Sequence, residues 1–263
     1  MSKSVVIVGA GLTGLLTAYR LQELGLNVTV LEARDRIGGR IHTLQFGKAK
    51  VEMGATWFNQ AHYHLADVIE EFKVPYFEQF MTGKSYFQTF SNVPPQEIAV
   101  PNDSPSYRFK NGTIHLLNAI NTKLKPNTVS TNEVVKHISV YENGAAIKTN
   151  TRTLNADVII TTLPPATLID QIEFSPALPK DVILLAEQTH TWMQDAIKVA
   201  LTYKKPLFPH QNGGHALYHE PLFDGKLFIS GAETSKHHSG YMEGAIFAAE
   251  SVVAKLKNLH LTQ

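Results

Sequence analysis

Residues 5–40 read VVIVGAGLTGLLTAYRLQELGLNVTVLEARDRIGGR, and this stretch decides the fold. Its first four residues are an apolar, β-branched run that is typical of a buried parallel strand. Gly9, Gly11 and Gly14 then give the spacing G-x-G-x-x-G and lead into apolar residues at helical spacing. A second apolar run, VTVL, follows and ends before Glu32. The order of strand, glycines, helix, strand and acid predicts a β-α-β unit that binds a dinucleotide.

Each residue of this motif has a physical task. Gly9 permits the tight turn, Gly11 lets the backbone approach a pyrophosphate, and Gly14 lets the helix pack closely on the strand. The helix N-terminus presents N–H groups and a partial positive charge to the phosphates. Glu32 can accept hydrogen bonds from ribose hydroxyls, and its charge would repel a 2′-phosphate, which disfavours NADP. NAD and FAD both remain, and an ordinary structural turn is the alternative.

The segment ARDRIGGR, residues 33–40, separates these two cofactors. The backbone N–H groups around Gly39 and the guanidinium of Arg40 can reach the same diphosphate. Such a segment has little use in a simple NAD dehydrogenase, so it favours FAD. The alternative interpretation is a solvated loop with scattered arginines.

Several segments together resemble the flavin-dependent amine oxidases. They are VVIVGAGLTGL, LEARDRIGGR and VEMGATWF in the N-terminal part, and FISGAETSKHHSGYMEGAIFAAESV near the C-terminus. ADVIITTLPPATL and DAIKVALTYKKPLF are also similar to segments of this family, which includes monoamine, polyamine and L-amino-acid oxidases. The N-terminal motif is shared by many flavoproteins, whereas its combination with SGYMEG is much more specific.

The resemblance implies an α/β fold with two parts. A Rossmann-like FAD-binding domain, with a parallel sheet and a β-meander, is expected from residues 1–75, 112–165 and 225–263. A reduced, discontinuous α+β substrate-binding domain is expected from residues 76–111 and 166–224. The chain of 263 residues is short for the family, and the resemblance places the missing part mainly in the substrate domain.

The resemblance also implies which residues contact FAD. The glycine turn and the ARDRIGGR loop should hold the ADP half, and the main chain near Val135 should contact adenine. The flavin ring should lie along the VEMGATWF segment, and the C-terminal segment should hold its ribityl chain and pyrimidine end. The expected FAD-binding residues are Gly9, Gly11, Gly14, Glu32, Ala33, Arg34, Gly39, Arg40, Gly54, Ala55, Thr56, Val135, Glu233 and Met242.

Two residues are expected to act in catalysis. Lys198 corresponds to the lysine that holds a water against flavin N5 in this family, and it lies in an alternating pattern, residues 196–201, typical of a strand. Partial burial there would lower its pKa, whereas a lysine that faces solvent is the alternative. Tyr241 corresponds to one wall of an aromatic cage that guides an amine to the flavin. The candidates for the opposite wall are Trp57, Tyr218 and Phe223.

The implied activity is oxidation of an amine C–N bond by hydride transfer to flavin N5. Oxygen would be the acceptor and hydrogen peroxide the product, with a small-molecule amine as the substrate. Two alternatives stay open, because a fold does not fix a function. One is a flavin desaturase or dehydrogenase with another acceptor, and the other is a non-catalytic FAD-binding protein in redox sensing or in a complex.

The composition restricts the other function classes. The net charge of +1 gives no reason to expect a nucleic acid or an anionic membrane as a partner. The absence of cysteine excludes disulfides, cysteine-ligated metals and a cysteinyl flavin link, so we expect non-covalent FAD, with a histidyl link as the alternative. The 12 histidines lack the spacing of a metal site.

The targeting signals and the assembly state are also expectations. The first strand starts close to Met1, and no apolar run approaches the ~20 residues that span a bilayer. We therefore expect a soluble cytoplasmic protein without membrane contact. A homo-oligomer could complete a shortened substrate domain.

The remaining sequence predicts further elements from its periodicity and turn residues. Asn143-Gly144 predicts a hairpin turn, and the aromatic and proline-rich residues 76–109 predict strands and loops. Helices are predicted over residues 64–72, 113–124 and 241–257, and strands over residues 129–140, 145–149, 156–162 and 227–230.

Overall fold

The computed structural model describes residues 3–47, 49–79, 84–87, 94, 96–99, 105–193, 198, 200, 227–229 and 241–258. Three residues to which the sequence assigns a role, Tyr218, Phe223 and Glu233, lie outside this part of the chain. Most of the predicted strand over residues 196–201 also lies outside it.

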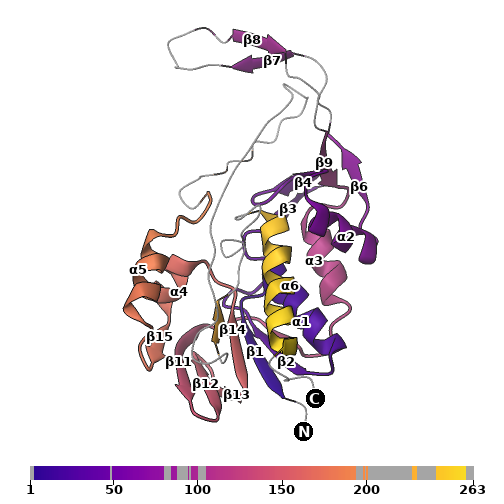
Figure 1. Cartoon of the computed structure of the whole chain (residues 1–263). Coiled ribbons are helices and arrows are strands. Elements are labelled where there is room, and N and C mark those ends of the chain that lie inside the picture. Colours follow the sequence, from indigo (N-terminus) through magenta and orange to yellow (C-terminus); the bar gives the residue numbers. More distant parts are fainter. Residues whose placement is uncertain are drawn as a thin grey trace.

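A parallel sheet of five strands forms the centre of the molecule (Figure 1). In spatial order its strands are β10 (Val129–Ser130), β2 (Asn27–Leu31), β1 (Ser4–Val8), β14 (Val158–Thr161) and β16 (Leu227–Ile229). Numbered by their place in the chain, these strands lie in the order 3-2-1-4-5, which is typical of dinucleotide-binding folds. The order reverses between β1 and β14, so a crevice forms at their carboxyl ends.

The side chains of β1 explain why its sequence is apolar without alternation. Val5 and Ile7 pack into the core on one face of the sheet, and Val6 and Val8 pack into a second core on the opposite face. Both faces of the sheet are therefore covered, as is usual for parallel sheets.

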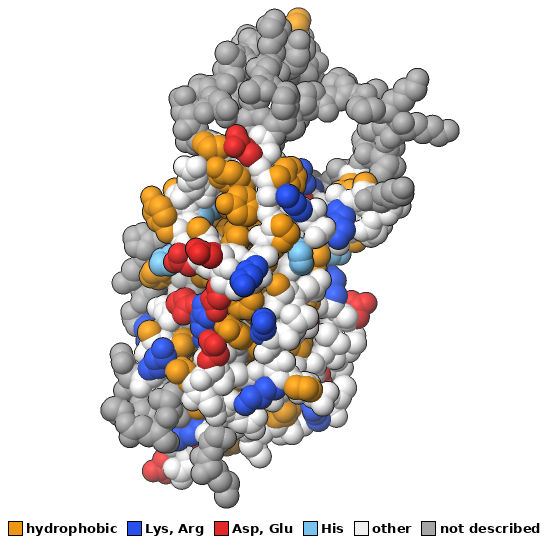
Figure 2. Space-filling view, turned by 90° about the vertical axis from the view of Figure 1, so that its right-hand side faces the viewer, with side chains coloured by type: hydrophobic (Ala, Val, Ile, Leu, Met, Phe, Trp, Pro, Cys, Tyr) orange, Lys and Arg blue, Asp and Glu red, His pale blue; other side chains and the backbone are white. Residues whose placement is uncertain are grey.

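Four helices lie on one side of the sheet. They are α1 (Leu12–Glu23), α2 (Tyr63–Glu71), α3 (Ile114–Asn121) and α6 (Met242–Asn258), and α1 packs against both α3 and α6 (Figure 1). Arg20 of α1 joins three of them, because its Nε lies 2.7 Å from Glu250 of α6 and its Nη2 lies 2.6 Å from Glu71 of α2. Figure 2 shows acidic and basic side chains next to one another on this side of the molecule.

A second sheet covers the opposite face. Its spatial order is β13 (Thr153–Ala156), β12 (Gly144–Thr149), β11 (Val135–Tyr141) and β15 (Glu173–Ser175). β11 and β12 form the hairpin predicted from the Asn143-Gly144 pair, and Tyr141 pairs with Gly144 next to the turn. The helices α4 (Pro165–Gln171) and α5 (Lys180–Gln188) lie beside this sheet (Figure 1).

Smaller antiparallel pairs complete the described structure. The strands β3 (Thr43–Phe46) and β4 (Ala49–Glu52) form one pair, and β7 (Lys84–Phe87) and β8 (Gln96–Ala99) form another. The strand β9 (Ser106–Phe109) lies between β5 (Phe58–Asn59) and β6 (Tyr76–Glu78). Among the described residues, no helix combines the length and the apolar character needed to cross a bilayer.

The predicted α/β fold with a parallel sheet and a β-meander is confirmed, and the predicted helices correspond to α2, α3 and α6. The single strand predicted over residues 129–140 is wrong, because these residues divide into β10 of the main sheet and β11 of the second sheet. Asn132 has a φ of +60°, in the left-handed region, and this conformation ends the extended run. The sequence analysis also missed α4, although Pro165 occupies the first helical turn, where proline is favoured.

Candidate functional site

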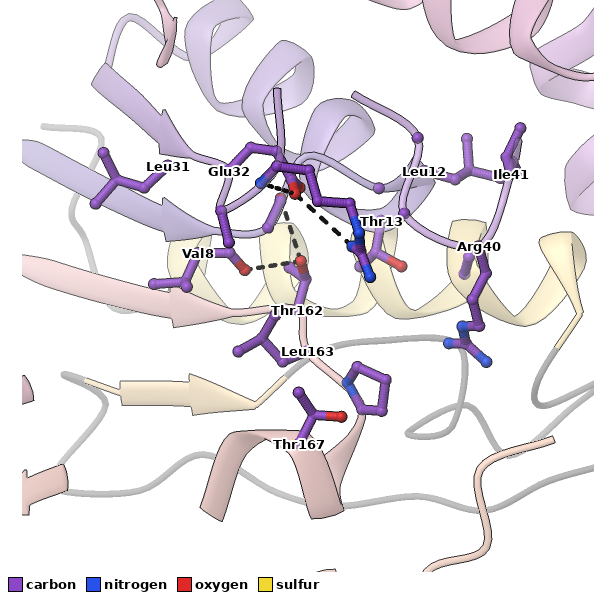
Figure 3. Close-up of a pocket in the computed structure, with 18 of the residues that line it drawn as sticks. Val8, Leu12, Thr13, Leu31, Glu32, Arg40, Ile41, Thr162, Leu163 and Thr167 are labelled. Atoms are coloured by element: carbon purple, nitrogen blue, oxygen red, sulfur yellow. Dashed lines mark hydrogen bonds and ion pairs between the residues drawn. The ribbon is translucent and has the colours of Figure 1, made fainter. Parts of the chain in front are cut away.

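A cavity of about 440 Å³ lies at the carboxyl ends of β1 and β14 (Figure 3). This is the point where the strand order reverses, and doubly wound folds bind their ligands there. Figure 3 shows Val8, Glu32 and Thr162 grouped at the strand ends, with Arg40 at the far side of the view from Leu31. The hydroxyl of Thr162 donates a hydrogen bond to the Val8 carbonyl at 2.9 Å, which ties the two strand ends together.

The three motif glycines have different roles in the structure. Gly9 has a φ of +105°, and a Cβ there would lie 2.6 Å from Thr162 Oγ1, so the turn requires glycine. Gly11 lines the cavity, and the nearest atom to a Cβ there would be 3.9 Å away. Gly14 does not line the cavity. A Cβ on Gly14 would lie 1.9 Å from the Gly9 carbonyl oxygen, so this glycine allows α1 to pack on the turn.

Glu32 connects the glycine turn with the loop of residues 33–40. The residue is only 4% exposed, and Oε2 accepts a hydrogen bond from the Ala10 backbone N–H at 2.9 Å. Oε1 accepts one from the Arg34 backbone N–H, also at 2.9 Å. A carboxylate has about four lone-pair positions, so Glu32 can still accept hydrogen bonds from ligand hydroxyls in the cavity that it lines.

The loop of residues 33–40 folds against the glycine turn. The backbone N–H of Gly38 donates to the Ala10 carbonyl at 2.8 Å, and Gly38 has a φ of +116°. Arg36 stays within the loop, where its guanidinium donates to the carbonyls of Ile37 and Gly39, and burial lowers its pKa. Arg40 lines the cavity. The loop can therefore offer backbone N–H groups and a guanidinium to an anionic ligand.

The cavity lining includes residues to which the sequence analysis gave no role. Glu133 is buried, and Thr151 Oγ1 and Arg152 Nε bond its carboxylate at 2.7 and 2.8 Å. A hydrogen bond from Thr149, together with those from Thr151 and Arg152, holds the pKa of Glu133 below its usual range, against the opposing effect of burial. The other such residues include Thr162, Leu163, Pro164, Thr167, Gln171 and Ile172. All six follow β14 in the chain, and the segment TTLPPATL was the signal that could have identified four of them.

The start of α6 closes one side of the cavity. Tyr241, Met242 and Ala245 line it, and the Tyr241 carbonyl accepts the Ala245 backbone N–H at 3.1 Å. The Tyr241 ring lies 5.8 Å from the ring of the buried His62, measured between centroids. Burial raises the pKa of Tyr241, so its hydroxyl keeps the proton at neutral pH.

Lys198 lies beside the segment that carries Ala55, which lines the cavity. Its ammonium donates to the Gly54 carbonyl oxygen and to Thr56 Oγ1, both at 2.8 Å. Lys198 is an exposed residue, so the solvent-facing alternative holds for part of its side chain. Partial desolvation of its ammonium still lowers its pKa; the charge of Glu52 opposes this shift, and the charge of Arg108 acts in the same direction.

The structure brings most of the expected site residues to one cavity. Of the expected residues, Gly14, Gly54, Thr56 and Lys198 do not line it, and Glu233 lies outside the described part of the chain. The lining combines a glycine turn at a helix N-terminus, a carboxylate and an arginine, which together fit a dinucleotide. The expected residues that line it are Gly9, Gly11, Glu32, Ala33, Arg34, Gly39, Arg40, Ala55, Val135, Tyr241 and Met242. In the described ranges, no group of three or more His, Asp or Glu residues could hold a metal ion.

Comparisons with known proteins agree with this geometry. The chain matches the family model described as flavin containing amine oxidoreductase over residues 12–99 and 85–223. A probable flavin-containing monoamine oxidase A of Dictyostelium discoideum is 41% identical over 80 residues, which are 30% of this chain and 18% of that protein. The putrescine oxidase of Kocuria rosea is 34% identical over 87 residues, which are 33% of this chain and 18% of that protein.

A solved structure of putrescine oxidase bound to putrescine has the same fold. It matches with a TM-score of 0.78 at 14% sequence identity, and the match covers 98% of this chain and 99% of that chain. At this identity the likeness shows the fold alone. The matched stretches of the two curated relatives span less than a fifth of those proteins, 18% of each.

Proposed function

The chain belongs to the family of flavin containing amine oxidoreductases, and on this premise we propose that it binds FAD non-covalently and oxidises a small-molecule amine. The observation that carries the proposal is the cavity at the strand reversal. Segments around Gly9, Glu32, Val135 and Met242, far apart in the sequence, meet there.

The lining residues support a specific placement of FAD. Glu32 would accept the ribose hydroxyls, and the main chain near Val135 would contact adenine. The turn at Gly11 and the guanidinium of Arg40 would bind the diphosphate. The segment Gly54, Ala55 and Thr56 would run beside the flavin ring, and Glu233 and Met242 would hold its ribityl and pyrimidine parts.

Lys198 and Tyr241 would act on the reacting groups. When bound, the flavin would accept a hydride from the carbon next to the amine nitrogen, and oxygen would then take the electrons to give hydrogen peroxide. Lys198 would hold a water at the reaction centre, and its lowered pKa keeps the ammonium closer to the neutral form than an ordinary lysine. Tyr241 would place the amine through its ring, which stays uncharged.

The relatives support one class of substrate to test first. One relative is a putrescine oxidase by name, and a solved structure of the same fold is bound to putrescine. A small aliphatic amine or diamine is therefore the first substrate to test. We also propose that residues 76–111 and 166–224 form the substrate side of the site, and that residues 1–75, 112–165 and 225–263 bind FAD.

The first test is the visible spectrum of the protein with FAD during anaerobic addition of amines. We expect an oxidised flavin band near ~450 nm that one amine class bleaches. Admission of air should then restore the band and release hydrogen peroxide. A band that no amine bleaches would contradict amine oxidation, and slow recovery in air would favour a dehydrogenase with another acceptor. The absence of a band after addition of FAD would refute the flavin assignment.

The second test is Lys198→Met in the FAD-loaded protein. We expect flavin reduction or reoxidation to slow by about 10²-fold or more, the typical size of an effect on a positioned proton-transfer group. FAD should stay bound, because Lys198 does not line the cavity. Lys123→Met, at an exposed position, is the matched control. Equal rates in both variants would remove Lys198 from the mechanism.

A further inference from the structure

Lys198, Gly54 and Thr56 form a closed triangle of hydrogen bonds. The Lys198 ammonium donates to the Gly54 carbonyl oxygen and to Thr56 Oγ1, both at 2.8 Å. The Thr56 hydroxyl donates in turn to the same Gly54 carbonyl at 2.9 Å. The three residues come from segments more than 140 positions apart, since 142 residues separate Lys198 from Thr56.

The chemistry of these groups makes the triangle directional. An ammonium has three N–H donors, and a hydroxyl has one donor and two acceptor lone pairs. Because the Thr56 hydroxyl gives its proton to Gly54, its lone pairs are left to face Lys198. Within the part of the chain that the structure describes, the ammonium uses two of its donors in the triangle, and its third N–H would be directed to a group at the reaction centre.

The backbone under the triangle is also held in place. A Cβ on Gly54 would lie 1.7 Å from the Arg40 carbonyl oxygen, so only glycine allows this close approach. The backbone N–H of Ala55 donates to the same carbonyl at 3.2 Å. These contacts hold the backbone of the triangle against Arg40, and both Arg40 and Ala55 line the cavity.

We propose that Thr56 is a positioning residue whose hydroxyl fixes the direction of the Lys198 ammonium beside the cavity. The proposal rests on the catalytic role proposed for Lys198 and adds a side-chain function to Thr56, which was expected only to contact the cofactor. Valine has the shape of threonine without the hydroxyl, whereas serine keeps the hydroxyl.

Two other charges, those of Glu52 and Arg108, act on Lys198. Glu52 is buried, and it accepts hydrogen bonds from the Thr113 backbone N–H and from Thr43 Oγ1. Arg108 is the cation that acts on the Lys198 ammonium. Substitution of Thr56 changes neither charge, so a shift in the titration of Lys198 would report on the lost hydrogen bond.

The first experiment needs neither flavin nor amine. The rate at which an amine-reactive acylating reagent labels Lys198 is measured against pH by peptide mass spectrometry. Thr56→Val removes a hydrogen bond that stabilises the charged ammonium, so the pH at the midpoint of labelling should fall by about one unit. At any pH below the midpoint, labelling of Lys198 should then be about 10-fold faster than in the wild type. Thr56→Ser should restore the wild-type midpoint. If the substitution only made Lys198 more accessible to the reagent, the maximum labelling rate would change and the midpoint pH would not.

The matched control is Thr122→Val, which removes an exposed hydroxyl that donates to the Ala119 carbonyl at 2.8 Å, away from the cavity. Its midpoint should equal that of the wild type. The proposal is overturned if Thr56→Val leaves the midpoint in place, or if Thr122→Val moves it equally. Since labelling does not depend on turnover, it tests the hydrogen bond between Thr56 and Lys198 even if no amine bleaches the flavin.

The second experiment tests whether Thr56 acts through Lys198 in the FAD-loaded enzyme. Thr56→Val should lower kcat about 10-fold. KM for the amine should stay within about twofold, because Tyr241, the residue proposed to place the amine, is unchanged. In the Lys198→Met background the same substitution should have no further effect. Equal slowing in both backgrounds would show that Thr56 acts independently of the lysine and would overturn the proposal.

Discussion

Glu243 Oε2 accepts a hydrogen bond from the backbone N–H of Leu65 at 2.6 Å, although 178 residues separate them in the chain. Oε1 of the same carboxylate accepts the His64 backbone N–H at 2.9 Å. These two hydrogen bonds cap the first turn of α2, whose own N-cap residue, His62, makes no capping hydrogen bond with its side chain. Glu243 also lies in the first turn of α6, so this contact fixes the start of the helix whose Tyr241 lines the cavity.

The first prediction concerns this cap. Glu243 is 2% exposed, and Glu243→Gln leaves one acceptor oxygen for the two N–H groups, of which that of Leu65 is buried. We expect the free energy of unfolding to fall by about 1–3 kcal/mol, the cost of an unpaired buried donor. Urea denaturation of the FAD-free protein measures it, with Glu187→Gln at an exposed position of α5 as the control. Equal losses in the two variants would argue against the cap.

The second prediction concerns Gly14. A Cβ at this position would lie 1.9 Å from the Gly9 carbonyl oxygen, so Gly14→Ala should lower the free energy of unfolding by about 1–3 kcal/mol. Alanine is the better helix former by about 1 kcal/mol, which makes any net loss a measure of the clash. Thermal unfolding of the FAD-free protein is the measurement. A gain in stability would contradict the close packing.

The third prediction separates Gly11 from Gly14. The backbone of Gly11 is extended, with a φ of −77°, and a Cβ there meets no atom within 3.9 Å, so Gly11→Ala should change stability by less than about 0.5 kcal/mol. The added methyl group would enter the cavity and should raise the Kd for FAD at least about 10-fold. Titration of FAD by fluorescence quenching tests this. Unchanged binding would place the diphosphate away from Gly11.

The fourth prediction is a pH dependence. Asp157 Oδ2 accepts hydrogen bonds from the Ser4 backbone N–H at 2.7 Å and from Ser4 Oγ at 2.8 Å, and these bonds lower the pKa of Asp157, the backbone bond having the largest effect. A folded-state pKa below the unfolded value stabilises the protein above that unfolded value, and this contribution is lost as pH falls through the folded pKa.

The difference in unfolding free energy between wild type and Asp157→Asn should therefore be full at pH 6–7 and shrink below about pH 4. Urea denaturation at a series of pH values measures it. Asp67→Asn, at an exposed position of α2, controls for the loss of a surface carboxylate. A difference that stays constant down to about pH 3 would contradict the role of the Asp157 charge.

Local patterns sufficed for the part of the fold that is built from neighbouring residues. The apolar run before Gly9 and the run before Glu32 predicted β1 and β2, and the glycine spacing predicted the turn between them. Residues 129–140 show where this reasoning fails. Their apolar pattern predicts extended backbone, but it does not record that β10 and β11 pair in different sheets, because the break depends on the left-handed Asn132.

The site divides in the same way. The sequence by itself determined the turn and its acid, because Glu32 bonds to Ala10 only 22 residues away, within one β-α-β unit. Only the tertiary structure decided that Lys198 contacts Thr56. That contact depends on how distant segments pack around the sheet, and the pattern of each segment records which of its faces is apolar without recording the partner that covers it.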